Sequence, residues 1–207
     1  MAPTYTPTKE QAGFAMHNQI FLRWASRVLF IGGVLAVSYV GFALLHAKCY
    51  QAMAERSFEK QTQVDAKSGV SPHNTSPKEG DILGRIEIPR LGMKVVILEG
   101  TTSQTLRLGV GHIEGTALPG EAGNVALAGH RDTFFRGLKD IRANDEIQVQ
   151  SATGIARYEV DTVRVVAPDD IEVLAPSAGA AITLVTCYPF HFIGPAPERF
   201  VVHAHKQ

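Results

Sequence analysis

Two β-type runs, TLVTC at residues 183–187 and RFVV at residues 199–202, decide the fold of this chain. Apolar and β-branched residues dominate both runs, which is typical of strands. Tyr188-Pro189 ends the first run, because a proline restricts the residue before it and cannot donate to a β-ladder. If the two strands pair around the intervening loop, Cys187 and Arg199 meet at the same edge of the sheet.

A third run, NVALA at residues 124–128, precedes Gly129-His130-Arg131-Asp132. A thiol of ordinary pKa is only a few per cent ionised near neutrality, so a nucleophilic cysteine needs a partner that exchanges protons there. Histidine suits that role, and His130 stands at a strand end, as Cys187 does. Arginine can donate hydrogen bonds to a carbonyl or oxyanion, and Asp132 could orient the imidazole. Cys187, His130 and Arg199 are therefore the candidate catalytic residues.

Short β-type runs recur from Asp81 onward, punctuated by Gly, Pro, Asn and Asp. Short helices are expected near residues 101–106, 133–138 and 168–174. Seven or eight short strands in this length predict an all-β domain, either a closed or nearly closed β-barrel or a sandwich. The expected strands cover residues 82–88, 94–98, 124–128, 145–149, 156–166, 181–187 and 200–205.

The composition excludes some function classes. The 207 residues include 20 Lys and Arg against 20 Asp and Glu, and this balance argues against a nucleic-acid partner, which normally selects a basic surplus. The two cysteines, Cys49 and Cys187, lie far apart in differently composed regions, so a bridge between them is not expected.

An uncharged apolar segment, residues 28–45, follows Arg23, Trp24 and Arg27. As a helix it spans about 27 Å, close to the roughly 30 Å of a bilayer's hydrocarbon core. The flanking arginines put the N-terminus in the cytoplasm and the later residues outside. A cleaved signal peptide ending at residues 52–54 and a lipoprotein at Cys49 are alternatives; every export reading leaves the globular part on the same side.

The expected organisation is a cytoplasmic tail (residues 1–19), a transmembrane signal-anchor helix (20–46), a stalk and linker (47–79) and a catalytic domain (80–207). Residues 65–79, DAKSGVSPHNTSPKE, are rich in Ser, Pro and charge and have no apolar period, which is typical of a flexible linker.

The globular part resembles the sortases, membrane-anchored cysteine transpeptidases. Thr183-Leu184-Val185-Thr186-Cys187 is similar to the family's TLxTC signature, Arg199 falls where the family's arginine follows it, and GHRDTFF at residues 129–135 is similar to the segment carrying the family histidine. The run from Cys187 to Phe200 looks most like class D and the related Gram-negative group, although His191 stands where an aromatic residue is expected.

The resemblance implies an eight-stranded barrel and cleavage of an LPXTG-like signal between Thr and Gly. Cys187 would form a thioacyl enzyme, His130 would protonate the leaving amine, and Arg199 would hold the substrate or oxyanion. The implied partners are a surface protein bearing the sorting signal and an amine of the cell envelope, such as a peptidoglycan cross-bridge or precursor. The implied location is the bacterial plasma or inner membrane, with the catalytic domain outside.

Two further residues are candidates for substrate binding: Thr186, by the resemblance, and His112, in a loop-like segment that could line the cleft. No metal site and no cofactor are expected, because the histidines show no zinc-ligand spacing. Some sortases bind calcium through acidic residues; here Asp169, Asp170 and Glu172 are more simply a solvated turn.

Two other functions remain open at this stage. One is a thiol endopeptidase that hydrolyses its acyl enzyme without transfer to an amine. The other is a membrane-tethered β-barrel module for adhesion or assembly in which Cys187 is only structural. Acceptor-dependent products separate the first from a transpeptidase, and the rate of thiol alkylation tests the second.

Overall fold

The computed structural model describes residues 23–24, 26–42, 76–192 and 194–207. The chain divides into two units, residues 1–46 and 47–207. In the first unit, residues 26–42 are helical, and apolar side chains from Val28 to Phe42 are exposed on this helix. Among the described residues, no helix is both long and apolar enough to cross a membrane. The expected tail lies outside the described residues, as do residues 47–75 of the expected stalk and linker, whereas residues 23–24 and 26–42 of the expected anchor are described.

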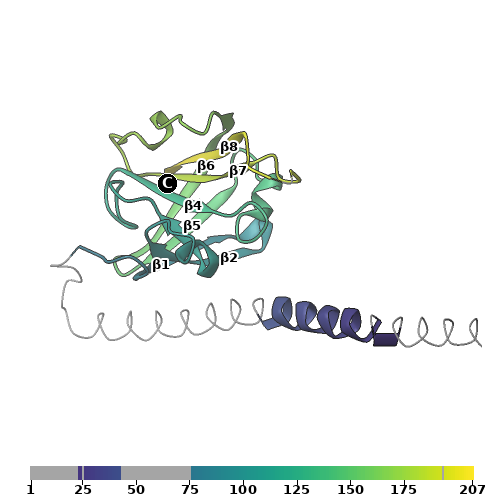
Figure 1. Cartoon of the computed structure of the whole chain (residues 1–207). Coiled ribbons are helices and arrows are strands. Elements are labelled where there is room, and N and C mark those ends of the chain that lie inside the picture. The colour runs from purple at the N-terminus through teal and green to yellow at the C-terminus, as the bar shows by residue number, and fades with distance from the viewer. Residues whose placement is uncertain (1–22, 25, 43–75, 193) are drawn as a thin grey trace, which may run out of the picture. The chain divides into compact units, whose positions relative to one another are not determined.

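In the second unit, the described residues form eight strands that close into a barrel in the order β1-β2-β3-β4-β7-β8-β6-β5 (Figure 1). The all-β prediction is therefore confirmed, and so is the eight-stranded barrel that the family resemblance implies; closure excludes the sandwich. The strands are β1 (Ile82–Ile88), β2 (Met93–Glu99), β3 (Val110–His112), β4 (Asn124–Gly129), β5 (Glu146–Ser151), β6 (Gly154–Val166), β7 (Ala181–Tyr188) and β8 (Glu198–Lys206).

The strand β3 has no counterpart among the runs expected from the sequence. It is only three residues long, too short for alternation to show, and it exists because it pairs in parallel with β2 and antiparallel with β4. Three helices are shorter than expected and begin later: α2 (Thr105–Leu108) and the 3-10 turns η2 (Arg136–Asp140) and η3 (Glu172–Leu174). A further 3-10 turn, η1 (Pro89–Leu91), was not expected from the sequence.

Alternation along the strands separates the core from the outer face, because successive side chains point to opposite sides of a sheet. On β7, Ile182 and Leu184 are fully buried in the main core cluster, together with Val125 and Leu127 of the neighbouring β4. Residues 181, 183, 185 and 187 of β7 therefore face outward. This places Cys187 on the outer side of the barrel wall.

Candidate active site

The pairing of β7 with β8 brings Cys187 directly opposite Arg199. The two strands are antiparallel neighbours, so residues in register share one face of the sheet. Both side chains are half-buried, and the Cys187 thiol is free. The juxtaposition expected from the sequence is present in the structure.

The parallel pairing of β4 with β7 brings His130 to the same end of the barrel. Gly129, the last residue of β4, is in register with Thr186, so His130 follows β4 at the level of Cys187. His130 is half-buried like the other two residues. Three short segments that are far apart in sequence therefore meet at one strand-end edge of the sheet.

Gly129 and the turn after it fix the backbone at His130. The buried Thr186 hydroxyl donates to the Gly129 carbonyl at 2.7 Å, and the Phe135 backbone N–H donates to the His130 carbonyl at 3.1 Å. Phe135 is fully buried, and its ring lies so close to Gly129 that a Cβ there would sit 2.7 Å from the ring. Glycine at this position lets the ring pack directly beneath the histidine turn.

Arg199 donates through Nη1 to two nearby backbone carbonyls, Glu198 at 3.0 Å and Ala196 at 3.3 Å. Both acceptors are in or beside the loop between β7 and β8, and the Glu198 contact is exposed. A solvent-exposed hydrogen bond of this kind contributes only modestly to stability, because water can replace either partner.

Arg131 joins the histidine turn to the segment that follows Cys187. Its guanidinium donates to the carbonyls of Pro189 at 2.9 Å, Phe192 at 2.8 Å and Gly194 at 3.1 Å, and lies 6.0 Å from the centre of the Phe192 ring. The sequence pattern assigned Arg131 no role of its own. The only signal was its place next to His130.

The outer face beside Cys187 is lined by small side chains. Register with β7 places Ala126 and Ala128 of β4 on this face with Thr183 and Val185. Sequence reasoning missed this feature because it needs the strand register, which local composition does not supply.

Asn124 fastens the loop between β6 and β7 at the far end of this face. Its side-chain amide donates to the carbonyls of Val173 and Ala175 at 3.4 and 3.2 Å, and its oxygen accepts from Thr183 at 2.8 Å. Asn124 is buried, and these contacts join β4, β7 and this loop. The acidic residues of the possible calcium site belong to this loop; among the described residues, no group of three or more His, Cys, Asp or Glu side chains is placed to hold a metal.

The two candidates for substrate binding lie apart from the outer face. Thr186 is buried on the core side, one residue out of phase with Cys187. His112 is also buried; its Nδ1 lies 2.9 Å from Glu99 Oε2 and its Nε2 3.0 Å from the Ala117 carbonyl. After His112 the chain runs beside β4 away from Gly129. The substrate-binding roles of Thr186 and His112 stay predictions. In the structure, both side chains form hydrogen bonds with other residues of the protein.

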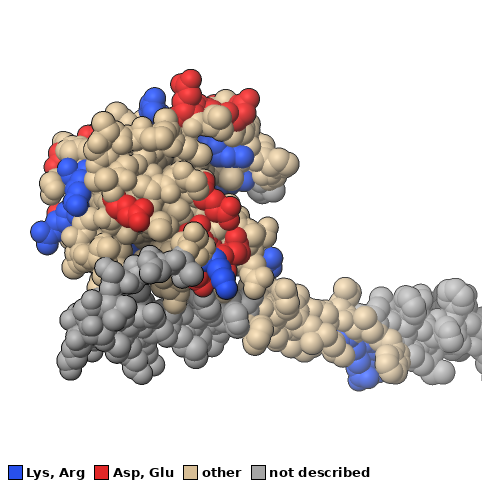
Figure 2. All heavy atoms as spheres, turned by 90° about the vertical axis from the view of Figure 1, so that its left-hand side faces the viewer, with Lys and Arg blue, Asp and Glu red and all other residues tan. Residues whose placement is uncertain are grey.

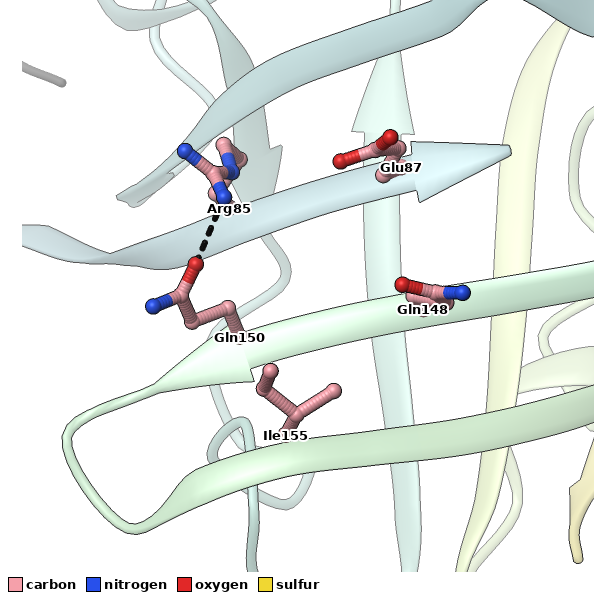
Figure 3. Close-up of a pocket in the computed structure, with 5 residues that line it drawn as sticks. All are labelled: Arg85, Glu87, Gln148, Gln150 and Ile155. Carbon is pink, nitrogen blue, oxygen red and sulfur yellow. Dashed lines mark hydrogen bonds between the residues drawn. The ribbon is translucent and has the colours of Figure 1, made fainter. Parts of the chain in front are cut away.

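One small cavity lies away from these residues, on the outer side of β1, β5 and β6 (Figure 3). Its lining is Arg85, Glu87, Gln148, Gln150 and Ile155, and Arg85 donates to Gln150 at 2.7 Å. With about 30 Å³ of space, it has room for little more than a water molecule. It is too small to bind a peptide.

Comparisons with known proteins agree with this geometry. The sortase domain family matches residues 86–207. Sortase D of Bacillus subtilis (strain 168) is 29% identical over 184 residues, which are 84% of this chain and 93% of that protein. Sortase A of Bacillus anthracis is 28% identical over 137 residues, covering 64% of this chain and 65% of that one.

Solved structures show the same likeness. The Clostridium perfringens Sortase D5 transpeptidase superposes with a TM-score of 0.62 and 30% identity, covering 77% of this chain and 97% of that one. The Clostridium perfringens sortase C structure with the C-terminal cell wall sorting motif gives a TM-score of 0.58 and 31% identity, over 74% of this chain and 87% of that one. The class D resemblance is consistent with these matches. The chain belongs to the sortase family of cysteine transpeptidases.

Proposed function

We propose that this enzyme cleaves an LPXTG-like sorting signal between Thr and Gly and transfers the acyl group to an amine of the cell envelope. The observation that carries the proposal is the register that sets Cys187 opposite Arg199 and brings His130 to the same strand ends. A nucleophile, a proton carrier and an oxyanion donor are the parts that acyl transfer requires. Sortases act on proteins with sorting motifs, and a related sortase C has been solved with such a motif.

The chemistry runs in two steps. The Cys187 thiolate attacks the threonine carbonyl, and Arg199 donates hydrogen bonds to the oxyanion that forms. The carbon–nitrogen bond to glycine breaks, His130 gives its proton to the leaving amine, and a thioester to Cys187 remains. An incoming amine then attacks the thioester, gives a proton to His130 and releases the Cys187 thiolate, which restores the starting state.

The outer face beside Cys187 is the proposed seat of the sorting peptide. Ala128 and Val185 are half-buried on this face and have small side chains, and the loop held by Asn124 lies at its far end. An extended sorting peptide that lies along this face would present its threonine carbonyl to Cys187.

We also propose that the enzyme is a single-pass protein of the bacterial plasma or inner membrane, with the barrel outside. The support is the uncharged sequence of residues 28–45, the arginines before it and the apolar side chains exposed along the helix of residues 26–42. Protease added to intact spheroplasts should degrade the barrel, while alkaline carbonate should leave the chain in the membrane fraction. Protection from protease, or release by carbonate, would contradict this location.

The deciding experiment compares the full-length chain with its Cys187→Ala variant in detergent. A fluorogenic LPXTG-type peptide is supplied with and without triglycine, and the products are identified by mass spectrometry. Cleavage after Thr that needs Cys187, with triglycine joined to the product, is expected. Cysteine-dependent cleavage with no capture of several amines would instead support the thiol endopeptidase. No cleavage, with slow alkylation of Cys187, would support the structural module.

A further inference from the structure

Arg131 occupies an unusual position between the two halves of the proposed catalytic apparatus. It directly follows His130, yet its side chain bonds to the loop that directly follows Cys187 and Tyr188. The loop leaves the sheet at Pro189 and returns at Glu198 with Arg199 next in line. The guanidinium therefore contacts the connection between the proposed nucleophile and the proposed oxyanion donor.

Its hydrogen bonds suit a clamp. Nη1 donates to the Pro189 carbonyl, and Nη2 donates to the carbonyls of Phe192 and Gly194. Guanidinium N–H groups form a rigid planar fork, so acceptors spread over several residues are fixed in distance and direction together. The contact with the Phe192 ring at 6.0 Å adds a cation–π attraction on the same loop.

The other end of the clamp is also fixed. The backbone beside Arg131 is held by the Thr186 hydroxyl on Gly129 and by the turn in which the Thr133 and Phe135 N–H groups donate to the His130 carbonyl. A loop bonded to Arg131 is therefore bonded to a rigid base, and motion of the loop relative to His130 must break several hydrogen bonds.

The other contacts of the described loop residues hold different parts of the loop. The aromatic side chains of Tyr188, Phe190 and Phe200 pack on one another, and the ring centres of Phe190 and Phe200 are 5.1 Å apart. These contacts secure the start of the loop to the core. Phe192 is 46% exposed. Among the described residues of the loop beyond Phe190, Arg131 holds the carbonyls of Phe192 and Gly194, and Arg199 holds that of Ala196.

We infer that Arg131 is a positioning residue: it clamps the loop between β7 and β8 to the histidine turn and so sets the distance of His130 from Cys187 and Arg199. The inference rests on the proposed function, because that function assigns those three residues their chemical roles. A misplacement of about 1 Å between reacting groups can lower a rate by about a hundredfold, so the clamp should act on the chemical step more than on peptide binding.

The test measures kcat and KM for an LPXTG-type peptide with the full-length chain and its Arg131→Ala, Arg131→Lys and Phe192→Ala variants. Rates are expressed per active site, counted by mass spectrometry of the alkylated peptide that contains Cys187, because the full-length chain also carries Cys49. Arg131→Ala is expected to lower kcat by between about tenfold and a hundredfold with KM changed less than about threefold. Arg131→Lys should recover part of the loss, because ammonium donates to fewer of these carbonyls at once. Phe192→Ala should cause a smaller loss.

Arg136→Ala is the matched control, since Arg136 is exposed at the start of η2 and its replacement removes the same charge five residues away. This variant should keep the parent kcat. Equal kcat for Arg131→Ala and the parent would overturn the inference, as would a loss confined to KM. If Arg131→Ala melts at a lower temperature than the parent, kcat of Arg131→Lys is compared with that of the parent at a temperature where both are folded. A lowered kcat there supports the inference, and an unchanged kcat overturns it. Inactivity of the parent, or activity in Cys187→Ala, would refute the proposed function instead.

Discussion

At the scale of single residues, the site depends on Gly129. Its carbonyl accepts from Thr186, its backbone lies against the Phe135 ring and it leads directly into His130. The sequence shows this glycine only as part of a Gly-His pair. A glycine is needed here because the buried ring of Phe135, in the turn that follows, leaves no room for a side chain.

Gly129→Ala should destabilise the fold. A Cβ at this position would lie 2.7–3.0 Å from three carbon atoms of the Phe135 ring, and the ring is fully buried. Overpacking of this kind costs about 1–3 kcal/mol. The melting temperature should fall, and the rate of peptide cleavage should fall with it because the ring lies beneath the histidine turn.

Gly137→Ala is the control for that change. A Cβ at Gly137 meets only Leu91 at 3.9 Å, an ordinary contact, so stability should stay within about 0.5 kcal/mol of the parent. Equal melting temperatures for Gly129→Ala and Gly137→Ala would show that the Phe135 ring moves aside freely.

Thr186→Val should lower stability by about 1–3 kcal/mol. The substitution keeps the shape but removes the hydroxyl that donates to Gly129, leaving a buried carbonyl without this donor. Thr186→Ser keeps the hydroxyl and should lose less. Chemical denaturation of both variants gives the comparison. If Thr186→Val raised KM while leaving the free energy of unfolding unchanged, the result would favour direct contact of Thr186 with the substrate, as the family resemblance implies.

At the scale of elements, two loops define the surroundings of Cys187. Arg131 holds the loop between β7 and β8, and Asn124 holds the loop between β6 and β7. Both anchors stand on or just after β4, the strand that leads into His130.

Asn124→Asp should raise KM for the sorting peptide. A carboxylate cannot donate to Val173 and Ala175, so the loop loses its tether while the oxygen that accepts from Thr183 remains. Because a loop-mediated wall contributes to ground-state binding, kcat should change less.

Thr183→Val is the matched variant, since it removes the hydrogen bond between Thr183 and Asn124 but leaves the two donors to the loop. KM for this variant should stay within about threefold of the parent. If Thr183→Val raised KM as much as Asn124→Asp, the packing of Asn124 rather than the loop tether would be responsible.

At the scale of the whole molecule, the barrel is closed by neighbours that are remote in sequence, and one buried carboxylate joins several of its elements. Asp145 accepts from Arg90 Nη2 at 2.6 Å and from the Arg142 backbone N–H at 2.7 Å, and also pairs with Arg90 Nε. These contacts link η1, the segment after η2 and the start of β5.

Acidic and basic side chains share one face of the barrel (Figure 2), and the formal net charge of the chain is zero.

The hydrogen bond from Arg90 is the main cause that lowers the pKa of Asp145 below its usual value. A lowered pKa in the folded state means that the folded chain binds fewer protons than the unfolded chain as the carboxyl titrates. The Asp145 contribution to stability is therefore present above the unfolded pKa of about 4 and is lost as the pH falls through the lower folded pKa.

Asp145→Asn should destabilise the chain by about 2 kcal/mol at neutral pH. The difference from the parent should shrink below about pH 4, where the unfolded parent chain takes up a proton that the folded carboxyl, with its lower pKa, still lacks. Urea unfolding at about pH 7 and about pH 3.5 measures both values. A pH-independent loss in Asp145→Asn would show that the charge is not responsible.

Glu146→Gln is the control for Asp145→Asn. Glu146 lies next to Asp145 in the chain, and its pair with Arg157, at 3.7 Å, is exposed. Exposed pairs of this kind contribute little to stability, so this variant should change the free energy of unfolding by less than about 1 kcal/mol.

Features with a local cause could be predicted from the amino-acid sequence. Alternation and β-branched residues predicted most strands, Pro189 predicted the end of β7, and the family motifs named Cys187, His130 and Arg199, which the register brings together. Such features depend on residue type and neighbours along the chain, so the pattern of the chain predicts them.

Other features needed the three-dimensional arrangement of the strands. The three-residue strand β3, the parallel pairing of β4 with β7 and the inward side of Thr186 all depend on which strands become neighbours. The roles of Arg131 and Asn124 depend on carbonyls that are 58 and 49 residues away in sequence. Long-range pairing is set by the summed burial of the whole chain, so no local stretch of sequence predicts these contacts.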